Sequence, residues 1–332
     1  MKRLLIHIGT GKTGTSTIQN FLFANQKKLA AKFSIFYPEQ GLSKIDHFGE
    51  EIHAHYPIVS WLNNRETESL DKLIHSINSS ACETAIISCE NFYHHLQTES
   101  IAYLGSVFKD YSVEIICYVR RQDQYMESAW KQQIKVGAMK MAFADFLQRH
   151  THEKYLNEVH ANYYRMLKPW ANVFGMDAIK VKVFDKSEWV EHDLIADFLN
   201  TCAIDEKHAL SVLTKPNLTN LALPTGLIRI LQKTNAKGLI PREEQQSFVM
   251  YLNKLTLFNN AALLSTQDRL AVIRNYSQSN AQLFSEFNKK EIPKCFQLSA
   301  IQATEKENTP TFFRRYCYFV ACRKLAAIKA FI

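Results

Sequence analysis

Glycine, lysine and hydroxyl residues are concentrated in the stretch IHIGTGKTGTSTIQ, residues 6–19. An apolar run precedes them and a helical pattern follows, so the stretch predicts a turn between a strand and a helix. Backbone N–H groups at a helix start, several hydroxyls and one ammonium together form a site for a phosphate or a similar anion. The residues predicted to line this anion site are Gly9, Lys12, Thr13, Gly14, Thr15, Ser16 and Thr17.

The same stretch contains the letters GKT, which also end the ATP-binding loop G-x-x-x-x-G-K-[ST]. In that loop the first glycine would stand at position 6, and this chain has Ile6 there. The residue needed for the tight turn is therefore missing. A kinase that uses ATP stays open as an alternative, with Asp185 as its candidate for the acidic residue that holds the metal.

A second candidate for anion binding is the stretch YVRRQDQYMESAW, in which Arg120 ends an apolar run and Ser128 follows eight residues later on a predicted helix. A guanidinium at a strand end and a hydroxyl two helical turns along can converge on one phosphate. Arg121 replaces Arg120 in this role if the frame is displaced by one residue. The pair predicts a second phosphate site, which a kinase would not need.

The stretch HIGTGKTGTSTIQNFL resembles the 5′-phosphosulfate loop of the sulfotransferases that use 3′-phosphoadenosine 5′-phosphosulfate (PAPS). The loop of that family reads Lys-[Ser/Thr]-Gly-Thr-[Ser/Thr] after the first strand, which matches residues 12–16. The resemblance implies that Lys12 contacts the oxygen bridging phosphate and sulfate. It implies that the 5′-phosphate is bound by Gly14, Thr15, Ser16 and Thr17.

The resemblance extends to the other end of the donor. It implies that Arg120 and Ser128 bind the 3′-phosphate, and that Lys215, in LTKPNLTNLALP, lies near the same phosphate. It covers about residues 3–290, although only the two donor motifs are specific. PAPS would then be the cosubstrate and the bisphosphate PAP the product.

The general base is predicted to be Glu90, which ends the apolar run TAIISCE. The resemblance supports this assignment, because heparan-type sulfotransferases have a catalytic Glu at a similar strand end. The family's lysine after that Glu is Asn91 here. The alternative bases are His47 and His95, and further histidines near them, His53, His55 and His94, are candidates for the acceptor pocket. His7 lies inside the first strand and is predicted to be either a core residue or a residue that supports the site from behind.

These residues need a framework of strands and helices. Apolar strand-like runs at 3–9, 33–38, 84–90, 113–120 and 178–185 alternate with helical patterns at 15–32, 66–79, 122–135, 152–174 and 188–200, and residues 40–64 are predicted to be irregular. Such alternation predicts an α/β fold, with a mostly parallel central sheet flanked by helices, similar to P-loop nucleotide hydrolases, and a helical C-terminal part. In open sheets of this kind ligands bind outside the carboxyl ends of the strands. The loop after Ile8, Glu90 and Arg120 are all expected there.

We predict one domain over residues 1–300, in which the donor-binding core covers about 1–200 and a helical part covers about 201–300. Residues 301–332 form a separate tail. Its segment FFRRYCYFVACRKLAAIKAFI, 312–332, is basic and aromatic. It is interpreted either as a helix packed on the domain or as an interfacial helix on anionic lipid.

Composition narrows the remaining choices. The chain has 332 residues and a net charge of +8, and residues 305–332 carry +4 of it, with six Lys or Arg against two Asp or Glu. The rest is mildly basic, which argues against a nucleic-acid groove. The 7 cysteines form no CxxC pair and no zinc pattern, so no metal is expected and the thiols are predicted to be reduced. No long apolar segment is present, so a cytoplasmic protein is predicted, peripheral to the inner membrane face if the tail binds lipid.

Together these features predict a PAPS-dependent sulfotransferase that transfers a sulfuryl group in line to a hydroxyl of a carbohydrate or glycoconjugate. The alternatives are the P-loop kinase and a catalytically inactive scaffold that binds PAP. Sulfuryl transfer resembles phosphoryl transfer, in which positioning and electrostatics do most of the catalysis. Lys12 would stabilise charge on the leaving phosphate, and Glu90 would accept the acceptor's proton.

Overall fold

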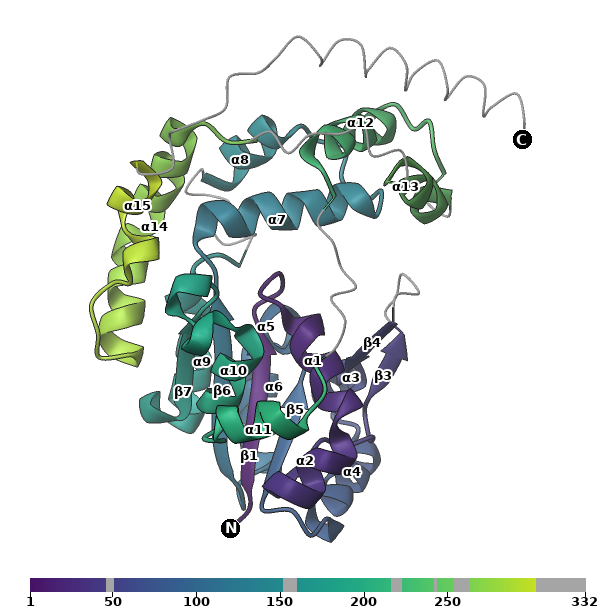
Figure 1. Ribbon diagram of the computed structural model, residues 1–332, viewed down its shortest axis with the longest axis vertical. Coiled ribbons are helices and arrows are strands. Elements are labelled where there is room, and N and C mark those ends of the chain that lie inside the picture. The colour runs from purple at the N-terminus through teal and green to yellow at the C-terminus, as the bar shows by residue number, and fades with distance from the viewer. Residues whose placement is uncertain (46–50, 152–159, 216–222, 242–243, 254–262, 303–332) are drawn as a thin grey trace. The chain divides into compact units, whose positions relative to one another are not determined.

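The computed structural model describes residues 1–45, 51–151, 160–215, 223–241, 244–253 and 263–302 (Figure 1). The described residues fall into two compact units. The first unit contains the described parts of 1–122, 160–219 and 276–296, and the second contains the described parts of 123–159, 220–275 and 297–332. The single domain predicted over 1–300 stays a prediction.

The first unit is built on a five-stranded parallel sheet with the strand order β2-β5-β1-β6-β7. In chain order its strands are β1 (Arg3–Gly9), β2 (Ile35–Phe36), β5 (Thr84–Ser88), β6 (Ser112–Val119) and β7 (Ile179–Val183). The predicted α/β fold with a mostly parallel sheet is confirmed. After β1 the chain builds β2 and β5 on one side and then β6 and β7 on the other. The carboxyl end of β1 is therefore the point at which the strand order reverses, which is where open α/β sheets bind ligands.

Helices cover both faces of this sheet (Figure 1). The helices that begin and end within the first unit are α1 (Thr15–Ala24), α2 (Gln26–Phe33), α3 (Tyr56–Asn64), α4 (Thr67–Ser79), α5 (Asn91–His95), α6 (Thr98–Val107), α9 (Tyr163–Phe174), α10 (Leu194–Thr201) and α11 (Glu206–Val212). Short 3-10 turns lie at Met176–Ala178, Lys186–Glu188, Val190–His192 and Lys294–Phe296.

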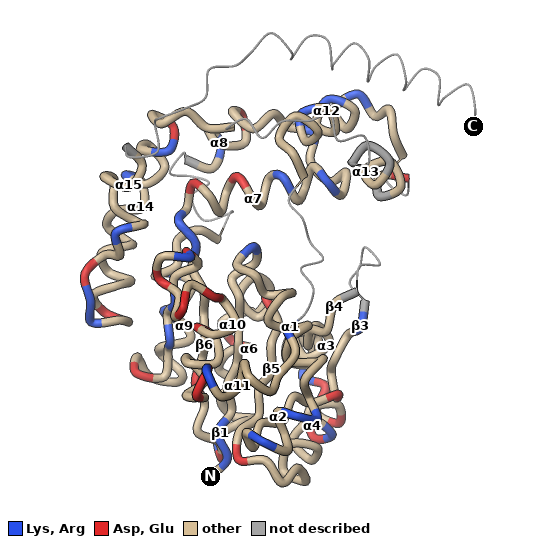
Figure 2. Tube along the Cα trace, viewed as in Figure 1, with Lys and Arg blue, Asp and Glu red and all other residues tan. Residues whose placement is uncertain are grey.

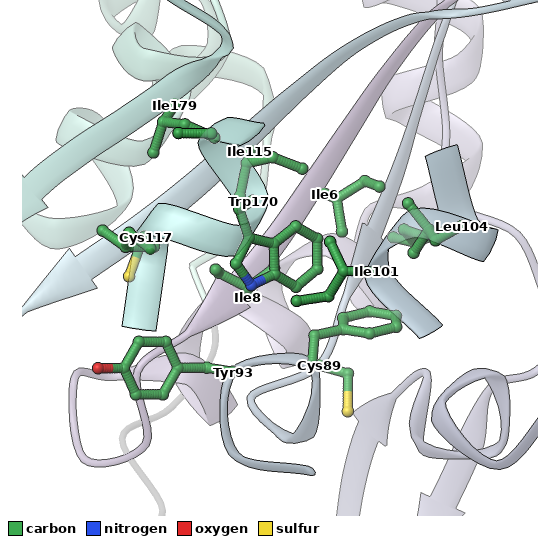
Figure 3. Packing of buried hydrophobic residues seen from close by; sticks show 14 of the residues in the cluster. Ile6, Ile8, Cys89, Tyr93, Ile101, Leu104, Ile115, Cys117, Trp170 and Ile179 are labelled. Atoms are coloured by element: carbon green, nitrogen blue, oxygen red, sulfur yellow. The ribbon is translucent and has the colours of Figure 1, made fainter. Parts of the chain in front are cut away.

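The alternation of side chains along β1 divides the core into two clusters. Leu4, Ile6 and Ile8 pack with α3, α4, α6 and α9 on one face, whereas Leu5 packs with α1, α2, α10 and α11 on the other. Figure 3 shows part of the first cluster, where Ile6 and Ile8 meet side chains of β6 and the indole of Trp170 from α9. Because both faces are buried, most positions of β1, β5 and β6 are apolar, whereas β7, at the edge of the sheet, alternates Ile and Val with Lys180 and Lys182.

The second unit is helical. Its helices are α7 (Gln122–Lys135, from Asp123 onward), α8 (Phe143–Thr151), α12 (Thr225–Ala236), α13 (Gln245–Asn253), the first part of α14 (Thr266–Phe287) and α15 (Leu298–Gln302). Arg269 of α14 binds Asp123 at 2.7 Å and Glu127 at 3.0 Å, and Asn235 Nδ2 donates to the carbonyl of Ile134 at 2.9 Å. α7 is thus held by α12 and α14. The helical character predicted for the chain after residue 205 is confirmed for the described residues.

Some predicted elements differ from the structure. The helix predicted over 15–32 is two helices, because Asn25 turns its side-chain amide onto the carbonyls of Phe21 and Thr214, both at 2.9 Å, and its backbone leaves helical geometry. Residues 40–64 are not irregular: β3 (Ser43–Ile45) and β4 (Glu51–Ala54) form an antiparallel pair, and α3 follows.

One predicted helix begins later than expected, and another lies partly outside the described residues. The pattern over 188–200 contains a 3-10 turn first, and the helix begins after Asp193, whose carboxylate accepts from the amides of Ile195 and Ala196. Of the helix predicted over 152–174, residues 152–159 lie outside the described part, and α9 begins after the capping residue Asn162.

Within the described residues, none of the helices is both long enough and apolar enough to cross a membrane. The tail at 312–332 lies outside the described part of the chain, so its two interpretations stay predictions. The five cysteines within the described residues, Cys82, Cys89, Cys117, Cys202 and Cys295, are all free thiols.

Candidate active site

The candidate site lies at the carboxyl end of β1, where the loop of residues 10–14 leads into α1. The amide of Thr10 donates to the carbonyl of Tyr118 in β6 at 2.8 Å, and the hydroxyl of Thr13 donates back to the carbonyl of Thr10. Thr13 is fully buried, so its hydroxyl holds the loop in shape. Because the Thr13 hydroxyl is used within the loop, the predicted contact of Thr13 with the donor would be made by its backbone amide.

Gly14 precedes α1 in left-handed geometry, with φ of 75°. A Cβ at this position would lie 2.4 Å from Leu194 Cδ2 and 3.0 Å from Phe184 Cε2, so only glycine fits. The first helical hydrogen bond runs from the Ile18 amide to the Gly14 carbonyl at 3.1 Å. The amides of Thr15, Ser16 and Thr17 consequently belong to the N-terminal turn, whose N–H groups have no acceptor within the helix and favour an anion.

Arg120 follows β6 directly and lies beside this loop. One of its guanidinium nitrogens, Nη1, donates to the carbonyl of Lys12 at 3.2 Å, and the guanidinium is 5.4 Å from the ring centre of Phe184. Arg121 points elsewhere, donating to the carbonyl of Cys295 at 3.1 Å. Of the two arginines, Arg120 is the one that contacts the predicted donor loop.

Glu90 lies on the opposite side of the loop. It follows β5 and precedes α5. The Cβ of Glu90 lies so near Gly9 that a Cβ added to this glycine would be 3.0 Å from it. Its carboxylate accepts two hydrogen bonds, at Oε1 from the hydroxyl of Tyr56 at 2.7 Å and at Oε2 from Gln19 Nε2 at 3.1 Å. The strand ends before Glu90, at Ser88, but the predicted position of Glu90 beside the loop is the one observed.

Two of the predicted histidines have identifiable contacts within the fold. His55 is buried, and its Nδ1 accepts from the Ser88 amide at 3.1 Å while its Nε2 lies 3.0 Å from the Pro38 carbonyl. Burial lowers the pKa of His55 to about 4. His53 stacks on Phe23, with 3.7 Å between ring centroids. Both histidines pack against neighbouring elements of the fold.

The other predicted histidines differ in position. His95 is exposed at the end of α5, and His47 lies outside the described residues. His7 is fully buried, with Nδ1 2.8 Å from the hydroxyl of Ser88, and burial lowers its pKa to about 3. Of the two roles predicted for His7, that of a core residue is confirmed. His94 contacts the loop, because its Nε2 accepts from the Gly11 amide at 3.1 Å.

The two remaining predicted donor ligands are less directly placed. Lys215 forms an ion pair of 2.6 Å with Asp193. The next residue in the chain, Leu194, packs over Gly14. Ser128 lies in α7, in the second unit, whereas Arg120 lies in the first. The convergence of Arg120 and Ser128 on one phosphate stays a prediction.

Four residues of the site belong to no recognisable sequence motif: Gln19, Tyr56, His160 and Phe184. Gln19 and Tyr56 hold the Glu90 carboxylate, Phe184 packs on Arg120 and Gly14, and His160 lies against His94, with 3.1 Å between their Nδ1 atoms. The only sequence feature that hints at Phe184 is its position near the end of the last apolar strand-like run, residues 178–185.

The kinase alternative depends on Asp185. Its carboxylate oxygen Oδ1 accepts from the amide of Ser187 at 3.0 Å and from the hydroxyl of the same residue at 2.7 Å. The group thus caps the 3-10 turn that follows β7. Among the described residues, no group of three or more His, Cys, Asp or Glu side chains is arranged to hold a metal ion.

Comparison with known proteins gives limited further information. No family model matches the chain. An uncharacterized protein of Archaeoglobus fulgidus is 26% identical over 179 residues, which are 52% of this chain and 45% of that protein, so the match spans slightly under half of the relative's length. The crystal structure of a sulfotransferase from Alicyclobacillus acidocaldarius is similar with a TM-score of 0.40 and 13% identity, covering 75% of this chain and 96% of that one. A similarity at that level carries no argument about function.

Proposed function

We propose that the protein is a PAPS-dependent sulfotransferase whose acceptor is a hydroxyl of a carbohydrate or glycoconjugate. The observation that carries the proposal is the position of the loop of residues 10–14 between a cation, suited to binding the donor's phosphate, and a carboxylate, suited to accepting a proton. Arg120 donates to the Lys12 carbonyl on one side, and Glu90 lies against Gly9 on the other. The three come from adjacent strands, and Lys and Arg mark the loop after β1 and the end of β6 (blue in Figure 2).

The donor would be held by the loop and by Arg120. In the proposal the amides at the start of α1 and the hydroxyls of Ser16 and Thr17 bind the 5′-phosphate, and Lys12 neutralises the charge that grows on the leaving oxygen. Arg120, with Ser128 and Lys215, binds the 3′-phosphate. An ammonium beside the leaving group is worth most when the site excludes water, because a low local dielectric strengthens its interaction.

The acceptor would be activated by Glu90. Each carboxylate oxygen can accept more than one hydrogen bond, so Glu90 keeps capacity for an acceptor hydroxyl while Tyr56 and Gln19 fix its orientation. In the transfer step the hydroxyl oxygen forms a bond to sulfur, the bond from sulfur to the bridging oxygen breaks, and the hydroxyl proton passes to Glu90. A carboxylate fixed in this way suits general base catalysis, for which geometry comes first.

Binding and turnover together test the proposal. Calorimetry should show PAP bound at least about 10-fold more tightly than AMP, which lacks the 3′-phosphate, since one additional charge-assisted phosphate contact is worth roughly 1.5–3 kcal/mol. Transfer of labelled sulfate from PAPS should be detectable in a panel of glycans, lipid-linked glycans and phenols. Glu90→Gln should lower turnover by about 100-fold or more with PAP affinity retained.

The alternatives give different results in the same experiments. A kinase would bind ATP in preference to PAP and transfer phosphate. A scaffold would bind PAP and transfer sulfate to no acceptor in the panel. Near wild-type turnover by Glu90→Gln would eliminate Glu90 as the base and leave His47 and His95 as candidates.

A further inference from the structure

The imidazole of His94 contacts the backbone of the loop after β1 at Gly11. α5 begins directly after Glu90, and His94 lies one turn along, with its amide donating to the Glu90 carbonyl at 3.3 Å. From there Nε2 accepts the hydrogen of the Gly11 amide at 3.1 Å. A Cβ at Gly11 would be 2.9 Å from the same nitrogen, so the contact requires glycine at this position.

The acceptor role of Nε2 fixes the tautomer of His94. Because Nε2 must carry a lone pair, the ring proton of a neutral His94 is on Nδ1, which lies 3.1 Å from Nδ1 of His160. The second ring then accepts at Nδ1 and carries its own proton on Nε2. The rings are stacked, with 5.4 Å between centroids and 23° between planes, and the Tyr93 hydroxyl donates to the His160 carbonyl at 2.8 Å. His94 is therefore oriented by a partner from outside its own helix.

The residue that follows Gly11 is the lysine on which the proposed chemistry depends. Lys12 adopts left-handed backbone geometry, with φ of 66°, which is unfavourable for a residue with a Cβ. The dipeptide of Gly11 and Lys12 is held at both ends, at the Gly11 amide by His94 and at the Lys12 carbonyl by Arg120. These two contacts restrain a conformation that the chain would otherwise disfavour.

We infer that His94, backed by His160, is a positioning residue of the donor loop, which presents Lys12 to the donor by holding the Gly11 amide. The inference rests on the proposed function. Its central contact joins two residues of the chain, His94 and Gly11, so it can be measured separately from donor binding. Burial, together with the neighbouring His160 and His95, lowers the pKa of His94 to about 3, so the imidazole is neutral near pH 7 and keeps its lone pair.

The test compares two substitutions of similar size. His94→Gln can direct its amide oxygen at the Gly11 amide, whereas His94→Phe fills the space without an acceptor. The exposed His75 supplies a matched histidine control as His75→Ala. All variants are compared in the full chain by amide hydrogen exchange of the peptide containing residues 9–14 and by PAP binding.

We expect His94→Phe to accelerate exchange of this peptide by about 5-fold or more and to weaken PAP binding by about 5- to 100-fold, the range for leaving one amide without its hydrogen-bond partner. His94→Gln should stay within about 3-fold of wild type in both measurements, as should His75→Ala. If His94→Phe does not fold, His94→Leu takes its place.

Two results would overturn the inference. One is unchanged loop exchange in His94→Phe, and the other is an equal loss in His94→Gln and His94→Phe that follows their melting temperatures, which would indicate a packing role only. If wild-type protein does not bind PAP, the proposed function fails, and the exchange measurement still decides whether His94 holds the loop.

Discussion

The hydroxyl of Tyr56 donates a hydrogen bond to Oε1 of Glu90 across 2.7 Å, from the first residue of α3 to the residue that precedes α5. With Gln19 of α1 on Oε2, the carboxylate is oriented by two helices that do not contain it. A base that must meet an acceptor hydroxyl and a sulfuryl group in line benefits from such restraint, because small displacements reduce the rate strongly.

Removing one of these restraints should reduce turnover and leave donor binding intact. We expect Tyr56→Phe to lower kcat by about 10-fold, with PAP affinity within about 2-fold of wild type, since the hydroxyl donates to the proposed base, Glu90. Tyr111→Phe is the matched control, because its hydroxyl donates to Asn78 at 2.7 Å away from the site. Equal effects of the two substitutions on kcat would contradict an orienting role for Tyr56.

Replacing Arg120 should reduce the preference for PAP over AMP, because the two ligands differ only in the 3′-phosphate. Arg120→Ala should remove most of the preference, a loss of about 10-fold or more in the ratio of the two dissociation constants. The ratio is more informative than PAP affinity alone, since Arg120 also donates to the Lys12 carbonyl. Arg121→Ala, which loses a bond to the Cys295 carbonyl, should lower stability and keep the ratio.

Gly14→Ala should destabilise the first unit and weaken PAP binding. The new methyl group would overlap Leu194 Cδ2, and the left-handed backbone adds about 1 kcal/mol for any residue with a Cβ. We expect a total loss of roughly 2–4 kcal/mol in the free energy of unfolding, measured by urea denaturation. Gly238→Ala isolates the backbone cost, because Gly238 also has positive φ but no neighbour within 4 Å of an added Cβ. A loss no larger than that of Gly238→Ala would contradict the steric argument.

Stability should decrease as the pH falls below the ordinary histidine value. Burial is the main reason that the pKa values of His7, His55 and His94 are lowered from 6.5, to about 3, 4 and 3. Between these values and 6.5 the unfolded chain binds more protons than the folded one, so the stabilising contribution is complete above pH 6.5 and is lost on acidification. Three such groups contribute a slope of up to about 4 kcal/mol per pH unit.

The measurement for this prediction is urea denaturation between pH 7 and 5. His7→Gln should reduce the slope by about one third, because it removes one of the three groups, whereas the exposed His75→Ala should leave it unchanged. A slope unaffected by His7→Gln would show that His7 does not take up a proton on unfolding in this range.

The parts of the site that follow strands could be predicted from the sequence. Three of the five apolar runs end beside a group with obvious chemistry, and parallel strands bring their carboxyl ends to one edge, so the loop, Glu90 and Arg120 were expected together. The partners of these residues could not be predicted. Tyr56 and His160 reach the site because α3 and the chain before α9 pack on the same face, and no local pattern encodes that packing.

Short elements were the main source of error in the fold. β3 and β4 have only three and four residues and mix polar with apolar side chains. Strands this short do not show a recognisable alternation in the sequence. The break between α1 and α2 arises from side-chain hydrogen bonds of Asn25, one of which joins residue 214, far away in the sequence. A hydrophobic pattern that continues through the break gives no indication of it.

Asn25 also fixes how long α1 must be. Its side chain exchanges two hydrogen bonds with the backbone of Thr214, donating to the carbonyl and accepting from the amide, both at 2.9 Å, and Lys215 is the next residue. The 10 residues of α1 therefore separate the loop at its start from the Lys215 segment at its end. One inserted residue would turn everything after it by about 100° and carry Asn25 away from Thr214. A change in the length of the chain between Gly14 and Asn25 would consequently break the contact with Thr214.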